Sequence, residues 1–127
     1  LRVAIVLQRL EFDQSPKDFR QKYEKDQQEL AKKIAIAREK VQSVKIMDDL
    51  FYTISLICSE LDIDGLRGDL VTNRAAKALC AFEGRDVVEP NDLYRVMPLC
   101  LRHRLRKDPL ETIDSGEKIQ QILDKYF

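Results

Sequence analysis

The sequence predicts an all-α fold: a bundle of helices with one longer helix near the N-terminus. Charged residues make up 35% of the 127 residues and aromatic residues only 7%, a composition typical of charged amphipathic helices. Only four glycines and four prolines interrupt the chain. Apolar residues also recur at spacings of three and four, as they do on one face of a helix.

The N-terminal third is predicted to hold two helices. Residues 2–12 read as the end of a helix, because apolar side chains recur along them. Ser15 is a good N-cap and Pro16 suits a first turn, so we expect a long helix from residue 16 to about residue 41. Because residues 24–29 are all polar, the middle of this helix is expected in solvent. The pattern fits either a plain amphipathic helix or an arm that contacts a neighbouring subunit.

Four shorter amphipathic helices are expected to form the bundle, at residues 49–61, 67–82, 90–105 and 115–126. Asp48 is predicted to cap the first of them. Gly84 is a natural left-handed residue for ending the second. Pro98 lies inside the third, which predicts a kink there. Asp114 begins a capping pattern before the last.

Charge and cysteine content exclude several classes of protein. Lys plus Arg and Asp plus Glu both number 22, and a net charge of zero argues against extensive nucleic-acid binding. No apolar run is long enough to span a bilayer. The three cysteines, Cys58, Cys80 and Cys100, show no disulfide-framework spacing. No Cys-x-x-Cys pair accompanies His103, so no metal site is expected. A chain that begins at Leu1 is expected to be a fragment or a processed product.

An isolated arginine, Arg67, follows Gly65 and precedes Gly68 at the start of the predicted helix 67–82. A guanidinium can bridge two phosphate oxygens, and a helix N-terminus adds free N–H groups and partial positive charge. The two glycines would allow a close backbone approach or a left-handed turn. On the residues alone, Arg67 either contacts a phosphate, caps a loop or pairs with a nearby carboxylate of Asp62, Asp64 or Asp69. Asp69 itself would either orient Arg67 or cap the helix, and capping is the favoured interpretation.

A basic run ends the predicted third bundle helix, and its side chains are Arg102, His103, Arg104, Arg106 and Lys107. On a continuous helix, Arg102 and Arg106 would share one face. The run is either a solvated face with favourable charge at a helix C-terminus, or a subunit interface that docks on an acidic surface. Nucleic acid is a third alternative, disfavoured by the neutral net charge and by the lack of interleaved aromatic residues.

Signatures of a self-sufficient enzyme are missing. The chain has no Gly-x-x-x-x-Gly-Lys-Ser/Thr loop for phosphates and no apolar strand that ends in paired acids for magnesium. We therefore expect no catalytic residues in this chain alone and no ATP hydrolysis by it. Cys58 lies nine residues before Arg67, so its oxidation could disturb the turn, although burial in its helix is the simpler interpretation.

Two ordered motifs carry a family resemblance. The first is DGLRGD at residues 64–69 followed by VTNRAAKA at residues 71–78. The second is CLRHRLRKDPLE at residues 100–111 followed by IDSG at residues 113–116. Together they resemble the C-terminal helical lid of the magnesium chelatase ATPase subunit I, within the AAA+ superfamily. The resemblance extends over essentially the whole chain and is weakest at residues 20–48.

The resemblance implies a role for each region. Residues 1–14 would be the end of the ATPase core or a hinge, and residues 15–127 the helical lid. Arg67 would correspond to the sensor-2 arginine, which touches the terminal phosphate of ATP. The parent protein would use ATP and Mg2+, bound mainly by its core domain, and form hexameric rings. It would work with a second AAA+-like subunit and a porphyrin-binding subunit to insert Mg2+ into protoporphyrin IX for chlorophyll or bacteriochlorophyll synthesis.

Two alternatives stand beside this interpretation. One is the lid of a related MoxR-type AAA+ ATPase, which the second motif disfavours. The other is a stand-alone helical protein–protein interaction module. The chelatase interpretation implies the cytoplasm of a phototrophic bacterium or the stroma of a plastid.

Overall fold

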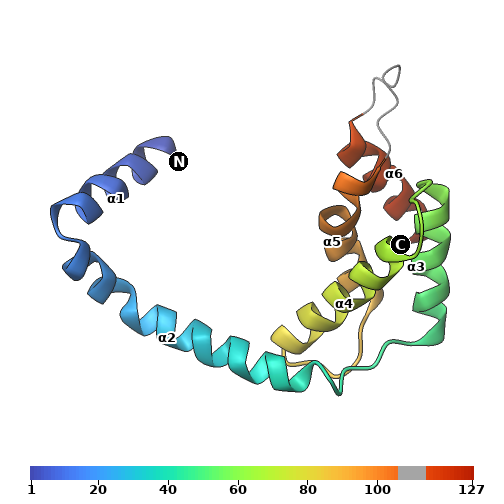
Figure 1. The fold of residues 1–127 in the computed structure, drawn as a ribbon, viewed down its shortest axis with the longest axis horizontal. Coiled ribbons are helices and arrows are strands. Elements are labelled where there is room, and N and C mark those ends of the chain that lie inside the picture. Colours follow the sequence, from blue (N-terminus) through green and yellow to red (C-terminus); the bar gives the residue numbers. More distant parts are fainter. Residues whose placement is uncertain (106–113) are drawn as a thin grey trace. The chain divides into compact units, whose positions relative to one another are not determined.

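The computed structural model describes residues 1–105 and 114–127 (Figure 1). These residues form six α-helices, namely α1 (Arg2–Gln14), α2 (Pro16–Lys40), α3 (Asp48–Glu60), α4 (Arg67–Phe82), α5 (Pro90–Leu101) and α6 (Ser115–Tyr126). A short 3₁₀ helix, η1 (Arg102–Arg104), follows α5. Within the described ranges, β-pairing is limited to an isolated parallel bridge between Lys45 and Val87. The prediction of an all-α fold is confirmed.

The chain divides into two compact units, Leu1–Ile36 and Ala37–Phe127. Helix α2 begins in the first unit and ends in the second. This division lies further along the chain than the boundary at residues 14 and 15 that the resemblance implies. That boundary, between a core or hinge segment and a lid, stays a prediction.

The first unit has an aromatic cluster but little buried surface. The rings of Phe12 and Phe19 meet edge to face with their centroids 5.6 Å apart, and Tyr23 lies 5.0 Å from Phe19. None of the residues of α1 is buried. Residues 24–29 are exposed, as their polar sequence predicts. At the start of α2, the Ser15 hydroxyl donates to Asp18 Oδ2 at 2.8 Å.

The second unit has a continuous apolar core. Helices α4 and α5 pack against each other, and α3 and α6 complete the bundle. Burial of one large aliphatic side chain contributes about 1.5–3 kcal/mol, so the core dominates the stability of this unit. The largest fully buried apolar side chains are Ile54, Ile57, Leu61, Leu93, Met97, Leu101, Ile119 and Leu123.

Helices α3 and α4 are each followed, two residues after their last helical residue, by a residue with left-handed backbone. Gly84 has a φ of 78°, and the Arg85 N–H donates to the Cys80 carbonyl at 3.0 Å. This Schellman arrangement confirms the prediction for Gly84. Asp62 takes the same place after α3, with a φ of 52°, and the Ile63 N–H donates to the carbonyl of Cys58, five residues earlier, at 3.0 Å.

Two predicted helix boundaries are wrong. Helix α3 begins at Asp48, and the N-cap position belongs to Met47, which makes no side-chain capping bond. The predicted helix 90–105 ends as an α-helix at Leu101. The reason lies in Arg104, whose Nε donates to the Cys100 carbonyl at 3.2 Å, an acceptor that a continuing helix would offer to the Arg104 backbone N–H.

The other predicted features of the last two α-helices have separate outcomes. Helix α5 continues through Pro98 to Leu101, and the kink expected at this proline stays a prediction. Asp114 caps α6 as predicted, because its carboxylate accepts from the Gly116 N–H at 3.0 Å. The cap satisfies one of the N–H groups that a helix start leaves unpaired.

Candidate functional site

The turn between α3 and α4 presents an unpaired arginine. Arg67 is the first residue of α4 and is exposed. Within the part of the chain that the structure describes, its guanidinium makes no hydrogen bond or ion pair. The alternative in which it pairs with Asp62, Asp64 or Asp69 is therefore not realised among these residues. The five donors of the guanidinium are available to a ligand.

The two glycines beside Arg67 serve different purposes. Gly65 has a φ of 67°, a left-handed conformation that side chains rarely adopt. Gly68 is buried, and a Cβ added there would lie 3.0 Å from Ile63 Cγ2, 3.3 Å from Leu101 Cδ2 and 3.4 Å from Cys58 Sγ. One glycine therefore shapes the turn, and the other lets the first turn of α4 approach the core closely. The expected left-handed turn is observed at Gly65, and an approach of this backbone to a phosphate stays a prediction.

Asp69 bonds to a neighbouring helix rather than capping its own. Its Oδ1 accepts from the Ser55 hydroxyl of α3 at 2.7 Å. The N-cap residue of α4 is Leu66, which makes no side-chain capping bond. The prediction that Asp69 caps the helix is wrong, because the carboxylate reaches across to α3. The bond joins the first turn of α4 to the preceding helix.

Cys58 lies under this turn as a protonated thiol. The side chain is buried, and burial together with the nearby Asp69 carboxylate raises its pKa from 9.0 to about 12. Burial also raises the pKa of Cys100. Because the thiolate is the reactive form, both thiols are poor nucleophiles at neutral pH. The redox role suggested for Cys58 stays a prediction, and burial, its alternative, is observed.

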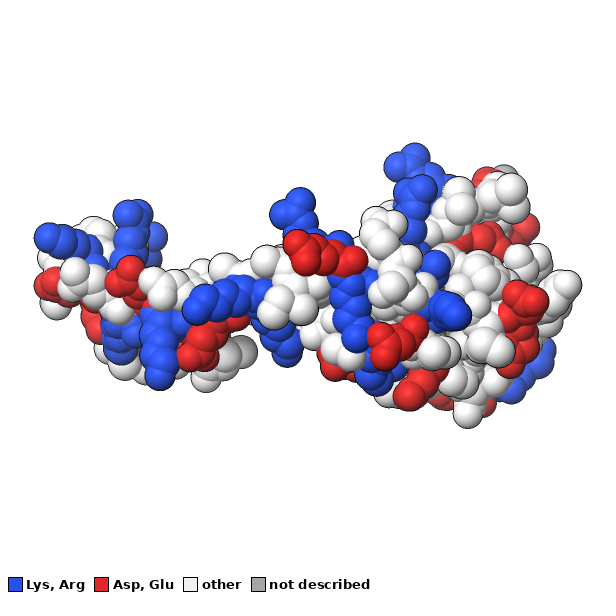
Figure 2. All heavy atoms as spheres, turned by 90° about the horizontal axis from the view of Figure 1, so that it is seen from below, with Lys and Arg blue, Asp and Glu red and all other residues white. Residues whose placement is uncertain are grey.

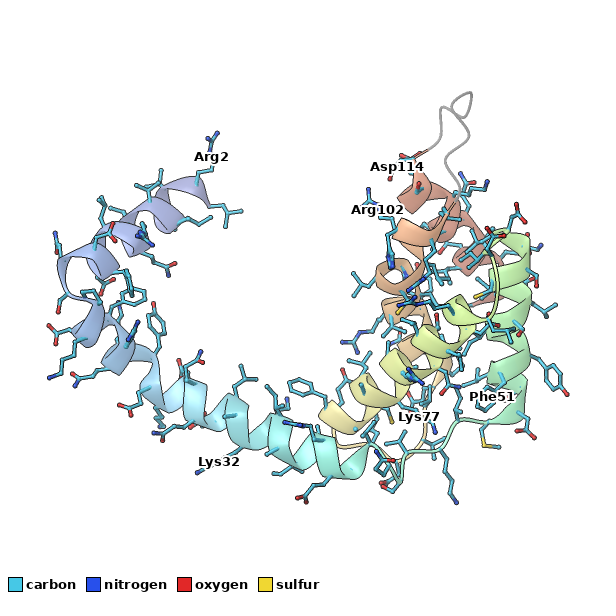
Figure 3. The ribbon with its side chains drawn as sticks, viewed as in Figure 1. Arg2, Lys32, Phe51, Lys77, Arg102 and Asp114 are labelled. Atoms are coloured by element: carbon cyan, nitrogen blue, oxygen red, sulfur yellow. The ribbon has the colours of Figure 1, made fainter. Side chains whose placement is uncertain are left out.

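Two arginines of the basic run, Arg102 and Arg104, make contacts within the bundle. Arg102 Nη2 lies 3.1 Å from Asp114 Oδ2, and the pair sits where η1 meets α6 (Figure 3). Arg104 holds the Cys100 carbonyl. Arg102 lies in the 3₁₀ turn, so the predicted helical face is wrong at this residue. Arg106 and Lys107 lie outside the described residues. The subunit interface assigned to this run stays a prediction.

The sequence did not lead us to expect a buried ion pair that lies at the turn before α5. Arg85 donates to both carboxylate oxygens of Asp92, with Nη1 at 2.9 Å from Oδ2, and the Asp92 side chain is only 1% exposed. The Glu89 N–H donates to the same Oδ2 at 2.9 Å. Glu83 pairs with Arg85 at 2.7 Å and with Arg95 at 2.6 Å. The sequence feature that could have indicated this pair is Asp92, an acid at the third position of a helix that begins with Pro90.

The surface carries both charges without segregation on the face that Figure 2 shows. Basic and acidic side chains alternate over it, in line with the zero net charge. Across residues 1–105 and 114–127, no cluster of three or more His, Cys, Asp or Glu side chains is arranged to hold a metal ion. Over the same residues, no helix is both long and apolar enough to cross a membrane.

Comparison with known families places this architecture. Residues 52–124 match the family model described as the AAA lid domain, a span that includes α4, α5 and the turn at Arg67. The chain belongs to the AAA lid domain family. In this AAA lid domain, Arg67 begins α4 and the matched span covers most of the second unit.

Three curated relatives match this AAA lid domain and its N-terminal helices over all 127 residues. The magnesium-chelatase subunit ChlI of Cyanophora paradoxa is 55% identical, and the chain covers 37% of its length. The proteins of the same name from Euglena gracilis and Anabaena variabilis are each 58% identical, with 36% and 38% of their lengths covered. The chain thus spans little more than a third of these relatives.

Proposed function

We propose that this chain is the lid part of the ATP-hydrolysing subunit of a magnesium chelatase, and that Arg67 contacts the terminal phosphate of ATP. The observation that carries the proposal is the exposed guanidinium at the first position of α4, which has no partner among the residues that the structure describes. The relatives named magnesium-chelatase subunit ChlI support the chelatase assignment over a MoxR-type lid.

The chemistry of the turn suits an anionic ligand. Arg67 supplies a permanent positive charge, and the first turn of α4 adds backbone N–H groups without a side-chain cap on its N-cap residue. Bound ATP and Mg2+ would supply the phosphoryl group and its charge neutralisation, held mainly by parts of the protein outside this chain. Arg67 would stabilise negative charge on the terminal phosphate and link nucleotide state to the orientation of the lid.

The remaining parts of the proposal concern the whole protein. Residues 1–14 end its ATPase core or form a hinge, and residues 15–127 form its lid. Exposed apolar side chains along α1, such as Val3 (72%) and Leu10 (53%), support packing of that helix against another part of the parent. The parent assembles as a hexamer and works with a second AAA+-like subunit and a porphyrin-binding subunit. It acts in the cytoplasm of a phototroph or in a plastid, and the lid alone does not hydrolyse ATP.

The test is Arg67→Ala in the full-length ATPase subunit, assayed for ATP hydrolysis and for Mg2+ insertion into protoporphyrin IX. We expect hydrolysis to fall about a hundredfold while folding and assembly persist. The matched control is Arg74→Ala, because Arg74 is an exposed arginine on the same helix, two turns from its N-terminus. Hydrolysis by Arg67→Ala equal to that of the control would contradict the phosphate contact.

A further inference from the structure

We propose that Ser55 is a positioning residue for Arg67, acting through its hydrogen bond to Asp69. The inference rests on the proposed contact between Arg67 and the terminal phosphate. It assigns to a serine on α3, twelve residues earlier in the chain, control over how well the lid distinguishes ATP from ADP.

The first turn of α4 needs an external support. Its N-cap residue, Leu66, makes no side-chain capping bond, and a helix start without such a bond frays more readily. Gly68 holds the turn down on the core side, where it approaches Ile63 and Leu101. The Ser55–Asp69 hydrogen bond of 2.7 Å holds the same turn against α3. Arg67, Gly68 and Asp69 are consecutive, so these two contacts fix the position of the backbone from which the Arg67 side chain extends.

The same bond also keeps the guanidinium free. Asp69 is the carboxylate nearest to Arg67 within α4, and a flexible Asp69 would compete with a phosphate for the arginine. Ser55 occupies Oδ1 of Asp69 and directs this carboxylate toward α3. Arg67 accordingly has no partner among the described residues. Ser55, together with the Cys58 thiol that also interacts with Asp69, thus holds the turn and directs its competing anion toward α3.

Ser55 contributes little else to the fold. Its hydroxyl faces Asp69 of α4, the side chain is otherwise exposed, and alanine is a better helix former than serine. Ser55→Ala should therefore fold as well as the wild-type protein. A purely structural role predicts a small change in stability and equal effects on all nucleotides. A positioning role predicts an effect confined to nucleotides that carry the terminal phosphate.

The experiment measures the affinities of the full-length ATPase subunit for Mg-AMP-PNP and for Mg-ADP by fluorescence competition. We expect Ser55→Ala to weaken AMP-PNP binding about three- to tenfold, the range for one exposed hydrogen bond, and to leave ADP binding unchanged. Ser55→Thr keeps the hydroxyl and should restore the wild-type preference. The matched control is Ser59→Ala, an exposed serine one turn later on α3, which should behave as wild type.

A double-mutant cycle separates this inference from the proposal beneath it. In the Arg67→Ala background, Ser55→Ala should cause no further loss of AMP-PNP affinity, because the group that it positions is gone. A loss that persists in that background, or equal losses for both nucleotides, would overturn the positioning role. If Arg67→Ala itself binds AMP-PNP as wild type does, the phosphate contact fails. If only Arg67→Ala is impaired and Ser55→Ala matches Ser59→Ala, the phosphate contact stands and the role of Ser55 fails.

Discussion

The turn that leads into α4 places an arginine at the first position of that helix, and the turn before α5 contains another. The structure treats the two arginines in opposite ways. Both turns follow a helix that ends in a left-handed residue, Asp62 in one case and Gly84 in the other. Arg85 is bound by a buried Asp92 and by Glu83. Arg67 is exposed and, among the described residues, unpaired. Arg85 stabilises the fold, and Arg67 is available to a ligand.

The electrostatic setting of the two turns explains this difference. Taking a carboxylate out of water is costly unless strong hydrogen bonds compensate, and Arg85 supplies two to Asp92. The turn before α4 buries no carboxylate to this degree, because Asp69 stays partly exposed and finds a hydroxyl partner. Within the described ranges, Arg67 therefore has no buried carboxylate to neutralise.

The strongest test of the comparison is the loss of each arginine. Arg85→Ala leaves the Asp92 carboxylate buried and unpaired, so the free energy of unfolding should fall by about 3 kcal/mol. Arg67→Ala removes no internal contact and should change it by less than about 0.5 kcal/mol. Urea denaturation of the chain followed by circular dichroism measures both. Equal losses for the two variants would show that Arg67 is also a structural residue.

The left-handed residues give a smaller effect of opposite signs. Gly84→Ala places a Cβ at a φ of 78° and should destabilise the chain by about 1 kcal/mol. Asp62→Gly relieves the same conformation at a φ of 52° and should stabilise it by about 0.5–1 kcal/mol. Shifts in the midpoint of urea denaturation report both changes. A loss of stability in Asp62→Gly would mean that the aspartate side chain supports its turn.

The smallest expected effect is a pH dependence in the turn before α5. Arg95 and then Arg85 hold the pKa of Glu83 below its ordinary value of 4.5. Because the folded-state pKa is lowered, the ion pairs stabilise the fold above the ordinary pKa, and this contribution is lost as the pH falls through the lowered value. In a plot of the free energy of unfolding against pH, measured by urea denaturation, Glu83→Gln should make the decline below about pH 5 (the acid limb) less steep. Asp26→Asn, at an exposed position on α2, provides a comparison variant. An unchanged acid limb in Glu83→Gln would contradict the assignment.

Helix positions were predictable because they depend on local chemistry. The expected helix 67–82 is observed as Arg67–Phe82. Its apolar residues recur with a helical period, and the left-handed Gly84 that ends it follows two residues after the last of them. The end of α5 was not predictable from the same rules. Arg104 replaces a backbone donor at the Cys100 carbonyl, and no local pattern indicates that a side chain will do so.

The candidate site was predictable in its central residue but not in its supports. Arg67 could be singled out because of its neighbouring glycines and its place at a helix start. Ser55 was not recognised, since nothing in its own helix marks a polar partner, and Asp69 was expected to cap α4 instead. The acceptor and donor are fourteen residues apart, so only the packing of α3 against α4 brings them together.

By itself, the sequence determined the all-α class, most helix bounds and the placement of an arginine at the start of α4. These features follow from periodicity, capping and left-handed residues, which act over one or two helical turns. Only the tertiary structure decided that Arg85 is bound internally while Arg67 has no partner among residues 1–105 and 114–127. Whether a charge is paired depends on which carboxylates the packing buries beside it, and packing joins segments that the linear sequence keeps apart.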